Sequence, residues 1–191
     1  AIAESLKTKA PSVTDMLKKL CDKELITYKK YQGALLTEYG RKTALNIIRK
    51  HRLWEVFLVE KLNFNWSEVH EVAEQLEHIK SQKLTNELDK FLGYPTKDPH
   101  GDPIPNIAGF IKYTTKVLLS DLSIGEKGKF VGVKDSSSAF LKFLDKRKIA
   151  LGSNIEILHI EDFDDSLHIG LDETNLSISI KSANNIYVTK I

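Results

Sequence analysis

The stretch from residue 51 to residue 78 reads HRLWEVFLVEKLNFNWSEVHEVAEQLEH, and its periodicity predicts two consecutive helices. Six of its side chains are candidate metal ligands: His51, Glu55, His70, Glu74, Glu77 and His78. At about 100° of rotation per residue, the last four fall within one helical stripe roughly 100° wide. Imidazole and carboxylate together suit a borderline-to-hard divalent cation. The stretch therefore predicts a metal site, or two adjacent ones.

A solvated helix face is the alternative interpretation, because Glu and His are common on exposed helices. An isolated pair such as His51 and Glu55 would indicate only a weak surface interaction. Residues 66–79 also place apolar side chains at the helical spacing of a core face: Val69, Val72, Ala73, Leu76 and Ile79. The ligand stripe therefore borders buried surface, where carboxylates need a partner, and a cation can serve as that partner.

Length and composition are those of a globular protein. The chain has 191 residues, of which 41% are apolar and 28% charged, so two or three small domains fit. Its single cysteine, Cys21, excludes an internal disulfide framework and fits a reducing compartment. No apolar run approaches membrane-spanning length, and the start, AIAESLKTKAP, lacks the hydrophobic stretch of a signal peptide. We therefore expect a cytoplasmic protein without a membrane partner.

The net charge of +2 conceals an uneven distribution along the chain. Residues 1–52 hold 12 Lys and Arg against 5 Asp and Glu, a net charge of +7, whereas residues 53–191 carry a net charge of −5. A basic segment joined to an acidic remainder is typical of a protein that binds the phosphate backbone of nucleic acid.

The basic segment has the pattern of a helix-turn-helix. Residues 2–6 suggest the end of a short helix, and residues 8–11 suggest a turn. Ser12 is the expected N-cap of a helix over 13–23, which would bury Val13, Met16, Leu17 and Leu20 and expose its polar face to a major groove.

Two short alternating runs follow this helix, at residues 25–31 and 34–37, around a Gln32-Gly33 turn. They predict a β-wing carrying Lys29 and Lys30, and hence a winged helix-turn-helix. The alternative is a helix-plus-hairpin unit that serves only for packing.

The middle of the chain continues with an amphipathic helix over 82–92, whose apolar side holds Leu84, Leu88, Phe91 and Leu92. A dimer seam and an intramolecular core stripe both fit this pattern. Residues 93–105, GYPTKDPHGDPIP, predict a rigid irregular connection, in which Asp98, His100 and Asp102 are interpreted as turn formers rather than metal ligands.

From about residue 118 the pattern is that of short strands separated by Gly, Asp and Asn. Five strands are predicted, at residues 125–133, 154–159, 166–171, 177–180 and 186–191, with a helical turn at 138–145. The acidic residues between 161 and 165 indicate a solvated turn. Five strands suit a small barrel, so the fold class is α+β, with a linker at residues 113–116.

Four phrases carry a resemblance to a known family. SVTDMLKKLCDKELITY (12–28), LTEYGRKTALNIIRKHRLWEVFLVEKL (36–62), EVHEVAEQLEHI (68–79) and DPHGDPIP (98–105) resemble the diphtheria toxin repressor family of metal-dependent transcriptional repressors, specifically its manganese-responsive branch. The resemblance implies a homodimer with three domains: a winged helix-turn-helix at 1–45, an all-helical metal-binding and dimerisation domain at 46–112, and a small SH3-like (FeoA-like) β-barrel at 118–191. It also implies repression of metal-uptake genes through a palindromic DNA operator.

The resemblance divides the ligands between two sites. His51, Glu55 and His70 match the family's ancillary site, with Asp135 of the C-terminal domain as a further candidate, and Glu74, Glu77 and His78 match its primary site. Iron-responsive members have Cys where this chain has Glu74. A carboxylate there favours Mn²⁺, with Fe²⁺ as the alternative and Zn²⁺, Co²⁺, Ni²⁺ or Cd²⁺ as possible surrogates. Relatives supply another primary-site ligand, an Asp, from a helix that precedes the position of Ile2.

The resemblance also implies DNA contacts. Lys9, Pro11, Ser12, Thr14 and Asp15 match positions that approach base edges, and Lys18, Lys29 and Lys30 match positions that contact phosphates. We therefore expect a metal-dependent repressor with no enzymatic activity and no small-molecule substrate. The alternatives from the residues are a binuclear metal enzyme, such as a hydrolase or oxygenase, and a metal-buffering protein; neither explains the basic winged helix.

Overall fold

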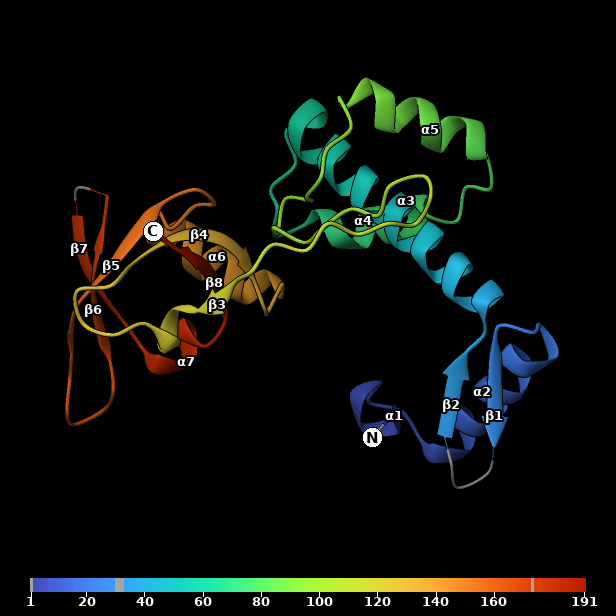
Figure 1. Cartoon of the computed structure of the whole chain (residues 1–191), viewed down its shortest axis with the longest axis horizontal. Helices are drawn as coiled ribbons and strands as arrows, with labels where there is room; N and C mark the ends of the chain where they lie inside the picture. The colour runs from blue at the N-terminus through green and yellow to red at the C-terminus, as the bar shows by residue number, and fades with distance from the viewer. Residues whose placement is uncertain (1, 30–32, 173) are drawn as a thin grey trace.

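The computed structural model describes residues 2–29, 33–172 and 174–191. The chain folds into three successive parts. Figure 1 shows a small winged-helix part at the N-terminal end, a helical part that follows it, and a sheet part that ends the chain. The predicted α+β fold class is therefore confirmed. Among the residues that the structure describes, no helix is both long enough and apolar enough to cross a membrane.

The winged-helix part contains α1 (Ile2–Ser5), α2 (Ala10–Asp22), β1 (Ile26–Lys29) and β2 (Gly33–Leu36). The two strands pair antiparallel, from Ile26 with Leu36 to Lys29 with Gly33, so the predicted hairpin is present. The turn predicted at Gln32 and the residue Lys30 lie outside the described residues.

The predicted start of the second helix was wrong. α2 begins at Ala10 with Lys9 in the N-cap position, so Ser12 lies in the first turn of the helix and is not its cap. Pro11 occupies the second helical position, where its fixed φ suits the helix and its missing N–H costs no hydrogen bond. Of the side chains expected to face inward, Val13 is buried and Met16 is exposed.

One long helix leads from the wing into the helical part. α3 (Glu38–Leu62) has 25 residues and therefore extends for about 37 Å. Thr37 caps its start, since the Thr37 hydroxyl accepts a hydrogen bond from the Gly40 N–H at 2.9 Å. Gly40 lies against the backbone of Leu25, where a Cβ would stand 1.8 Å from the Leu25 carbonyl oxygen. The wing therefore packs tightly on the first turn of α3.

Two shorter helices pack on α3: α4 (Val69–Leu76) and α5 (Gln82–Phe91). α3 and α4 share a core of Leu58, Val69 and Ala73, with Val72 and Leu76 partly buried against it. The helix predicted as far as Ile79 ends earlier, because Glu77 is its C-cap. The Lys50 ammonium donates to the carbonyl of Glu77, and positive charge at this end stabilises the helix terminus. Ile79 lies beyond the helix and is exposed, so its assignment to the core was wrong.

The apolar residues of α5 lie on two different faces, which bears on whether its apolar stripe forms a dimer seam or part of the core. Leu88 is buried with Leu53, Val56 and Ile104 in the core of the helical part. Phe91, in contrast, has 65% of its surface exposed. Part of the apolar stripe therefore serves the core, and part of it faces outward.

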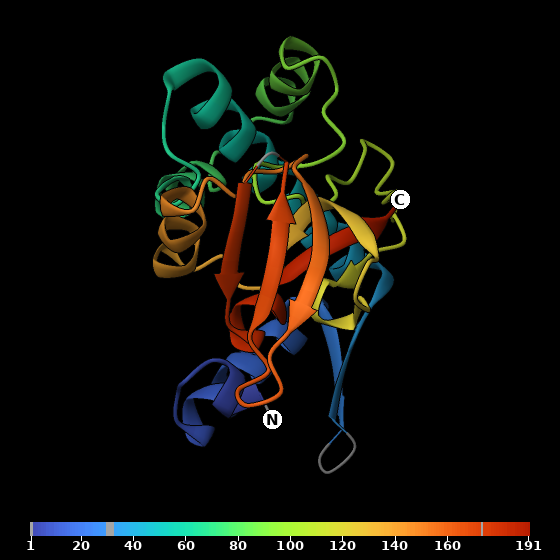
Figure 2. The ribbon, with the colours of Figure 1, turned by 90° about the vertical axis from the view of Figure 1, so that its left-hand side faces the viewer.

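The sheet part contains one antiparallel sheet of six strands in the order β3-β8-β4-β5-β6-β7. Their bounds are β3 Val117–Leu118, β4 Lys127–Val133, β5 Asn154–Ile160, β6 Leu167–Leu171, β7 Thr174–Ile178 and β8 Ile186–Lys190. Three short helical segments accompany them: η1 (Leu119–Asp121), α6 (Ser138–Lys146) and α7 (Ile180–Ala183). Figure 2 shows the outer strands of the sheet side by side. The alternating strands bury one apolar cluster, which includes Phe130, Ile155 and Ile169. Five strands were predicted. β3 was missed because it has only two residues, and the strand predicted at 177–180 was misplaced, because β7 ends at Ile178 and α7 begins at Ile180.

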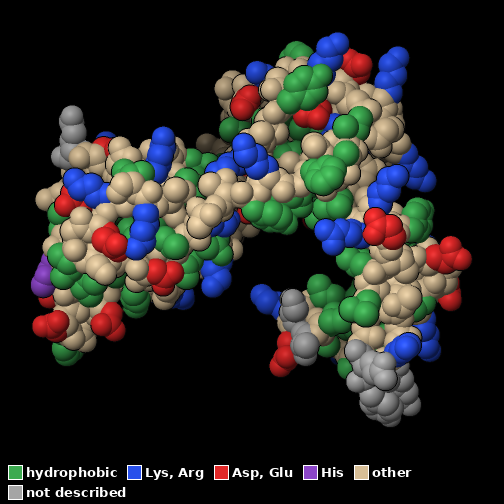
Figure 3. All heavy atoms as spheres, in the orientation of Figure 1, with side chains coloured by type: hydrophobic (Ala, Val, Ile, Leu, Met, Phe, Trp, Pro, Cys, Tyr) green, Lys and Arg blue, Asp and Glu red, His purple; other side chains and the backbone are tan. Residues whose placement is uncertain are grey.

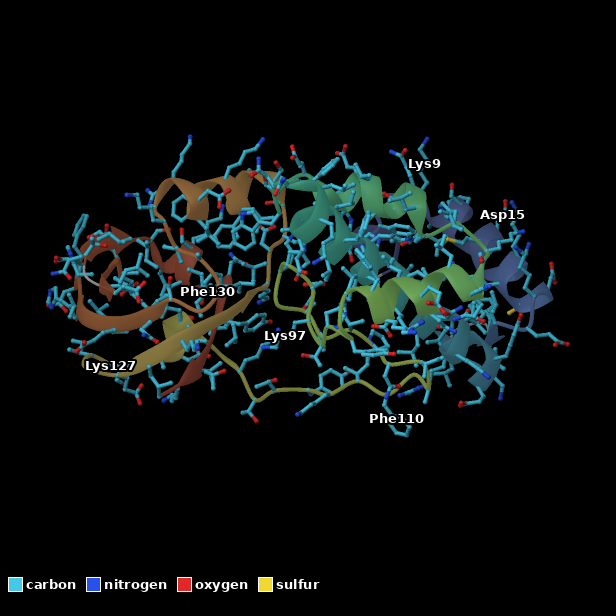
Figure 4. All side chains as sticks on the ribbon, turned by 90° about the horizontal axis from the view of Figure 1, so that it is seen from above. Lys9, Asp15, Lys97, Phe110, Lys127 and Phe130 are labelled. Carbon is cyan, nitrogen blue, oxygen red and sulfur yellow. The ribbon has the colours of Figure 1, made fainter. Side chains whose placement is uncertain are left out.

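The loop over 94–106 lies between the helical and sheet parts, as the labelled Lys97 shows in Figure 4. The Val133 N–H donates to the His100 carbonyl at 3.1 Å. Gly101 has a φ of +87° and packs on the backbone of β4, where a Cβ would lie 2.0 Å from the Val131 carbonyl oxygen and 2.5 Å from the Gly132 Cα. The sheet part therefore fixes the backbone of this loop at His100.

Candidate metal centre

The candidate ligands come from three segments that converge on the second half of α3. His51 and Glu55 stand one turn apart on α3, and His70 lies in the first turn of α4. Two groups bring donor atoms within 4.8 Å of one another: His51 with Glu55 and His70, and Glu55 with Asp98 and His100. Glu55 belongs to both groups.

His51 is the centre of the first group. Its Nε2 lies 3.0 Å from Glu55 Oε1 and 3.1 Å from His70 Nδ1. Its Nδ1 lies 2.7 Å from Glu77 Oε2, so Glu77 joins the group through His51. Burial alone lowers the pKa of His51, but the hydrogen bonds and negative charges of Glu55 and Glu77 outweigh burial and raise it. The raised pKa favours the protonated imidazole, so a cation binding here would compete with a proton.

Glu55 connects the two groups through its two oxygens. Oε1 lies beside His51 and His70, while Oε2 lies 3.7 Å from His100 Nδ1. The residue is 2% exposed. Burial alone raises the pKa of Glu55, but the nearby imidazoles of His100 and His51, through their positive charge and the hydrogen bond from His51, lower it to about 2. The carboxyl group is therefore negatively charged at neutral pH.

The second group is fully buried. Asp98 and His100 are 6% and 5% exposed. Nε2 of His100 lies 2.7 Å from the carbonyl oxygen of Trp66, and the two rings stack at 6.2 Å. Because a carbonyl accepts only, Nε2 carries a proton, and Nδ1 is the nitrogen that faces Glu55, where a cation would take the place of an Nδ1 proton. This orientation by a backbone carbonyl is the arrangement that metal-binding histidines use.

The negatively charged form of Asp98 is destabilised in this arrangement. Burial, and then the negative charge of Glu55, raise the pKa of Asp98 to about 6. Its Oδ1 accepts hydrogen bonds from the backbone N–H groups of His100 and Asp102, at 2.8 and 2.9 Å. Its Oδ2 lies 3.3 Å from Nε of Arg52. Two buried carboxylates beside one oriented imidazole fit a divalent cation, which would neutralise the repulsion between them.

The sequence interpretation treated Asp98 and His100 as turn formers, and the structure adds a second feature. They do form a turn, but they also lie against Glu55, and the DPHGDP sequence gives no sign of this burial. A spacing of one residue between an acid and a histidine was the only available signal.

The remaining candidate metal ligands are arranged differently. Glu74 and His78 are exposed and join neither group of donor atoms within the part of the chain described here. Asp135 is exposed too, and its Oδ1 accepts a hydrogen bond from the Ser137 N–H at 2.8 Å. It follows β4 by two residues and thus lies near the segment that contacts the His100 carbonyl.

The candidate DNA-binding residues that the structure describes are exposed side chains of the winged-helix part. α2 or its N-cap carries Lys9, Pro11, Ser12, Thr14, Asp15 and Lys18, and Lys29 ends β1; all seven are exposed. Figure 4 marks Lys9 and Asp15 at the periphery of the molecule. The Thr14 hydroxyl donates to the Ala10 carbonyl of its own helix at 3.2 Å. This surface is free to meet a nucleic acid.

Three family descriptions together match nearly all of the chain. Residues 1–34 match "Iron dependent repressor, N-terminal DNA binding domain", residues 37–106 match "Iron dependent repressor, metal binding and dimerisation domain", and residues 117–190 match "FeoA domain". The third match fits the predicted SH3-like domain.

Curated relatives match part of the chain. A "Probable metal transport system membrane protein" of Chlamydia trachomatis is 42% identical over 86 residues, which are 45% of this chain and 19% of that protein. The "Iron-dependent repressor IdeR" of Mycobacterium tuberculosis is 37% identical over 106 residues, which are 56% of this chain and 46% of that protein. The chain thus spans less than half the length of these relatives.

A solved structure matches the whole chain. A "Manganese-dependent transcriptional repressor complex with manganese" superposes with a TM-score of 0.88 at 30% identity, covering 100% of this chain and 89% of that one. The order of domains, the grouping of ligands on α3 and this likeness agree. The chain belongs to the iron-dependent repressor family, the family of the diphtheria toxin repressor.

Proposed function

We propose that this chain is a metal-dependent transcriptional repressor that binds a palindromic DNA operator and controls metal-uptake genes. The observation that carries the proposal is the position of Glu55. It belongs to both groups of candidate ligands, and it lies on α3, the same helix whose first turn packs against the wing. The state of the ligands is therefore connected to the DNA-binding surface by one continuous helix.

The residues proposed to hold the metal are His51, Glu55, His70 and Glu77 in one site and Glu55, Asp98 and His100 in the other. Asp135, Glu74 and His78 remain further candidates. A bound divalent cation would supply positive charge that compensates the clustered carboxylates. With that charge present, α4 and the loop over 94–106 are drawn to α3, which favours one orientation of the winged-helix part.

Mn²⁺ is the proposed metal, with Fe²⁺ as the alternative. Both groups hold carboxylate and imidazole donors without a thiolate or thioether, which favours a harder cation. Solved relatives described as manganese-dependent support this choice, and a related repressor is known with bound Cd²⁺ or Zn²⁺, which makes these ions plausible surrogates. Co²⁺ and Ni²⁺ suit the same donors.

The proposed assembly is a homodimer. The family description over residues 37–106 includes dimerisation, and the outward face of α5 exposes Leu84 and Phe91, with Tyr94 just beyond the helix. A second copy packing on these side chains would bury them. The proposed domains are those expected from the sequence: 1–45, 46–112 and 118–191.

A DNA-binding regulator needs access to the chromosome, so we place the protein in the cytoplasm. An enzymatic role has less support. A groove of about 930 Å³ lies between α3, α5 and residues 106–110, but its lining contains none of the candidate ligands. The candidate metal ligands lie outside this groove, where they are buried or contact one another.

Fluorescence anisotropy with a labelled palindromic operator tests the proposal. Adding Mn²⁺ should tighten operator binding about 5- to 150-fold, the usual range for coupling between two sites. Glu55→Gln should remove the metal response, whereas Glu60→Gln, an exposed carboxylate on the same helix, should keep it. Metal binding without any change in operator affinity would instead support a buffering protein.

A further inference from the structure

A second cluster of ligand-type side chains lies on the outer face of the sheet part, far along the chain from the centre on α3. It consists of His159 on β5, His168 on β6 and Glu161 just beyond β5. Nε2 of His168 lies 2.8 Å from Glu161 Oε1, and Nε2 of His159 lies 3.8 Å from the same oxygen. The two imidazole rings are 5.9 Å apart. The Glu161 oxygen thus lies between the two imidazoles, whose nitrogens stand farther apart than the donor atoms of the two groups at α3, so the exposed side chains would draw together around a cation.

A β-bulge creates this arrangement. Strand register shifts between Ile157 and His159, so that His159 pairs with His168 across the two strands. Side chains alternate along a regular strand, and since Ile157 is buried, His159 would also point into the core. The bulge changes the phase: Leu158 and His159 are both exposed. Bulges commonly re-aim one side chain in this way.

A neighbouring strand supports the second histidine. The Ser177 hydroxyl, on β7, lies 2.8 Å from Nδ1 of His168. When Nδ1 donates its proton to this hydroxyl, the lone pair of Nε2 faces Glu161 and the open side of the cluster. Metal-binding histidines characteristically have such a partner on the nitrogen that does not bind the metal.

The electrostatic surroundings also favour a cation. Residues 149–180 include seven Asp and Glu but no Lys or Arg. In Figure 3, imidazole surface is visible at the left-hand edge of the sheet part, above carboxylates at its lower end. A local excess of negative charge raises the concentration of cations at such a surface.

We propose that His159, His168 and Glu161 form a separate cation site on the FeoA-like domain, suited to Zn²⁺, Ni²⁺ or Cu²⁺ rather than Mn²⁺. Two of the three donors are imidazoles, and such a set follows the order of affinity in which Mn²⁺ is weakest. The side chains are exposed by 57%, 44% and 45%, which leaves room for water or a further ligand to complete the coordination shell. This site does not depend on the proposed repressor function.

Zinc stoichiometry of the full chain tests the proposal. In equilibrium dialysis against Zn²⁺, the double variant His159→Ala/His168→Ala should bind one Zn²⁺ fewer per chain than the unaltered protein. ¹⁵N chemical shifts of the histidine rings should identify Nε2 of His168 as a zinc ligand. Because all substituted side chains are partly exposed, thermal unfolding of the sheet part should be nearly unchanged.

Single variants separate chelation from general attraction. Glu161→Gln should lower the zinc affinity of this site at least 10-fold. Ser177→Ala should lower it about 10-fold through the loss of the supporting hydrogen bond. The matched control is Asp162→Asn, an exposed carboxylate of the same turn, which should leave affinity unchanged within 2-fold. Equal stoichiometry in the double variant, or equal losses in Glu161→Gln and Asp162→Asn, would overturn the proposal.

Discussion

Replacing Glu55 with Gln is expected to weaken the helical part in the metal-free protein and to remove its response to metal. Gln keeps nearly the same volume but cannot provide the negative charge that His51 and His100 face. The pKa of Glu55 falls from 4.5 to about 2, which corresponds to about 3 kcal/mol of stabilisation at neutral pH. The same charge raises the pKa of Asp98, an unfavourable effect that the substitution relieves. The net loss should therefore be on the order of 1–2 kcal/mol.

The pH dependence gives the sign of this effect. Because the pKa of Glu55 is lower in the folded state, its stabilisation is present above pH 4.5 and is lost as the pH falls toward 2. Urea unfolding of the metal-free protein can be followed by tryptophan fluorescence, since Trp54 packs on the cores of the helical part and Trp66 packs against the sheet part. The free energy of unfolding of Glu55→Gln should therefore fall less than that of the unaltered protein as the pH drops from 4.5 toward 2.

Adding Mn²⁺ completes the test. A ligand at 100 times its Kd stabilises the folded state by about 2.7 kcal/mol. The urea concentration at the midpoint of unfolding of the unaltered protein should therefore rise with Mn²⁺. Glu55→Gln should show almost no rise, whereas Glu60→Gln should behave like the unaltered protein. If Glu55→Gln retained the full Mn²⁺ stabilisation, the assignment of Glu55 to both metal groups would be refuted.

Three further predictions concern other links in the structure. Gly40→Ala should destabilise the wing and lower operator affinity, measured by anisotropy, because its Cβ would collide with the Leu25 carbonyl. Mn²⁺ affinity, measured by calorimetry, should fall as the pH drops through 6, because Asp98 then takes up a proton; Asp98→Asn should flatten this dependence and bind weakly at every pH. Lys18→Ala should weaken binding to all DNA sequences and reduce the salt slope by about one, and a change in base preference at a single operator position would show that Lys18 reads sequence instead.

Much of the fold follows from local patterns. The helix-turn-helix, the hairpin, α5 and four of the strands were predicted because apolar spacing and turn residues are local properties of the chain. Errors occurred at helix ends. Ser12 is a good N-cap residue, yet Pro11 two residues into α2 moved the start of the helix to Ala10. The end of α4 at Leu76 involves Lys50, a residue of another helix.

The candidate site divides in the same way. His51 and Glu55 are one helical turn apart, and His70 follows on the adjacent helix, so their convergence could be expected from spacing. Asp98 and His100 could not be identified, because a turn sequence does not reveal whether the turn is exposed or buried. Their burial depends on the sheet part, which contacts the His100 carbonyl from Val133.

Sequence by itself determined which residues could bind a cation, which segments form helices and strands, and where the positive charge for DNA is concentrated. The tertiary structure decided which of these residues meet. It placed Glu55 between two groups of ligands, and it moved Glu74 and His78 to the surface. The reason is physical: ligand type and periodicity are properties of neighbouring residues, whereas burial and convergence depend on how distant segments pack. Gly101 allows one such close contact, since any side chain there would separate the loop from β4.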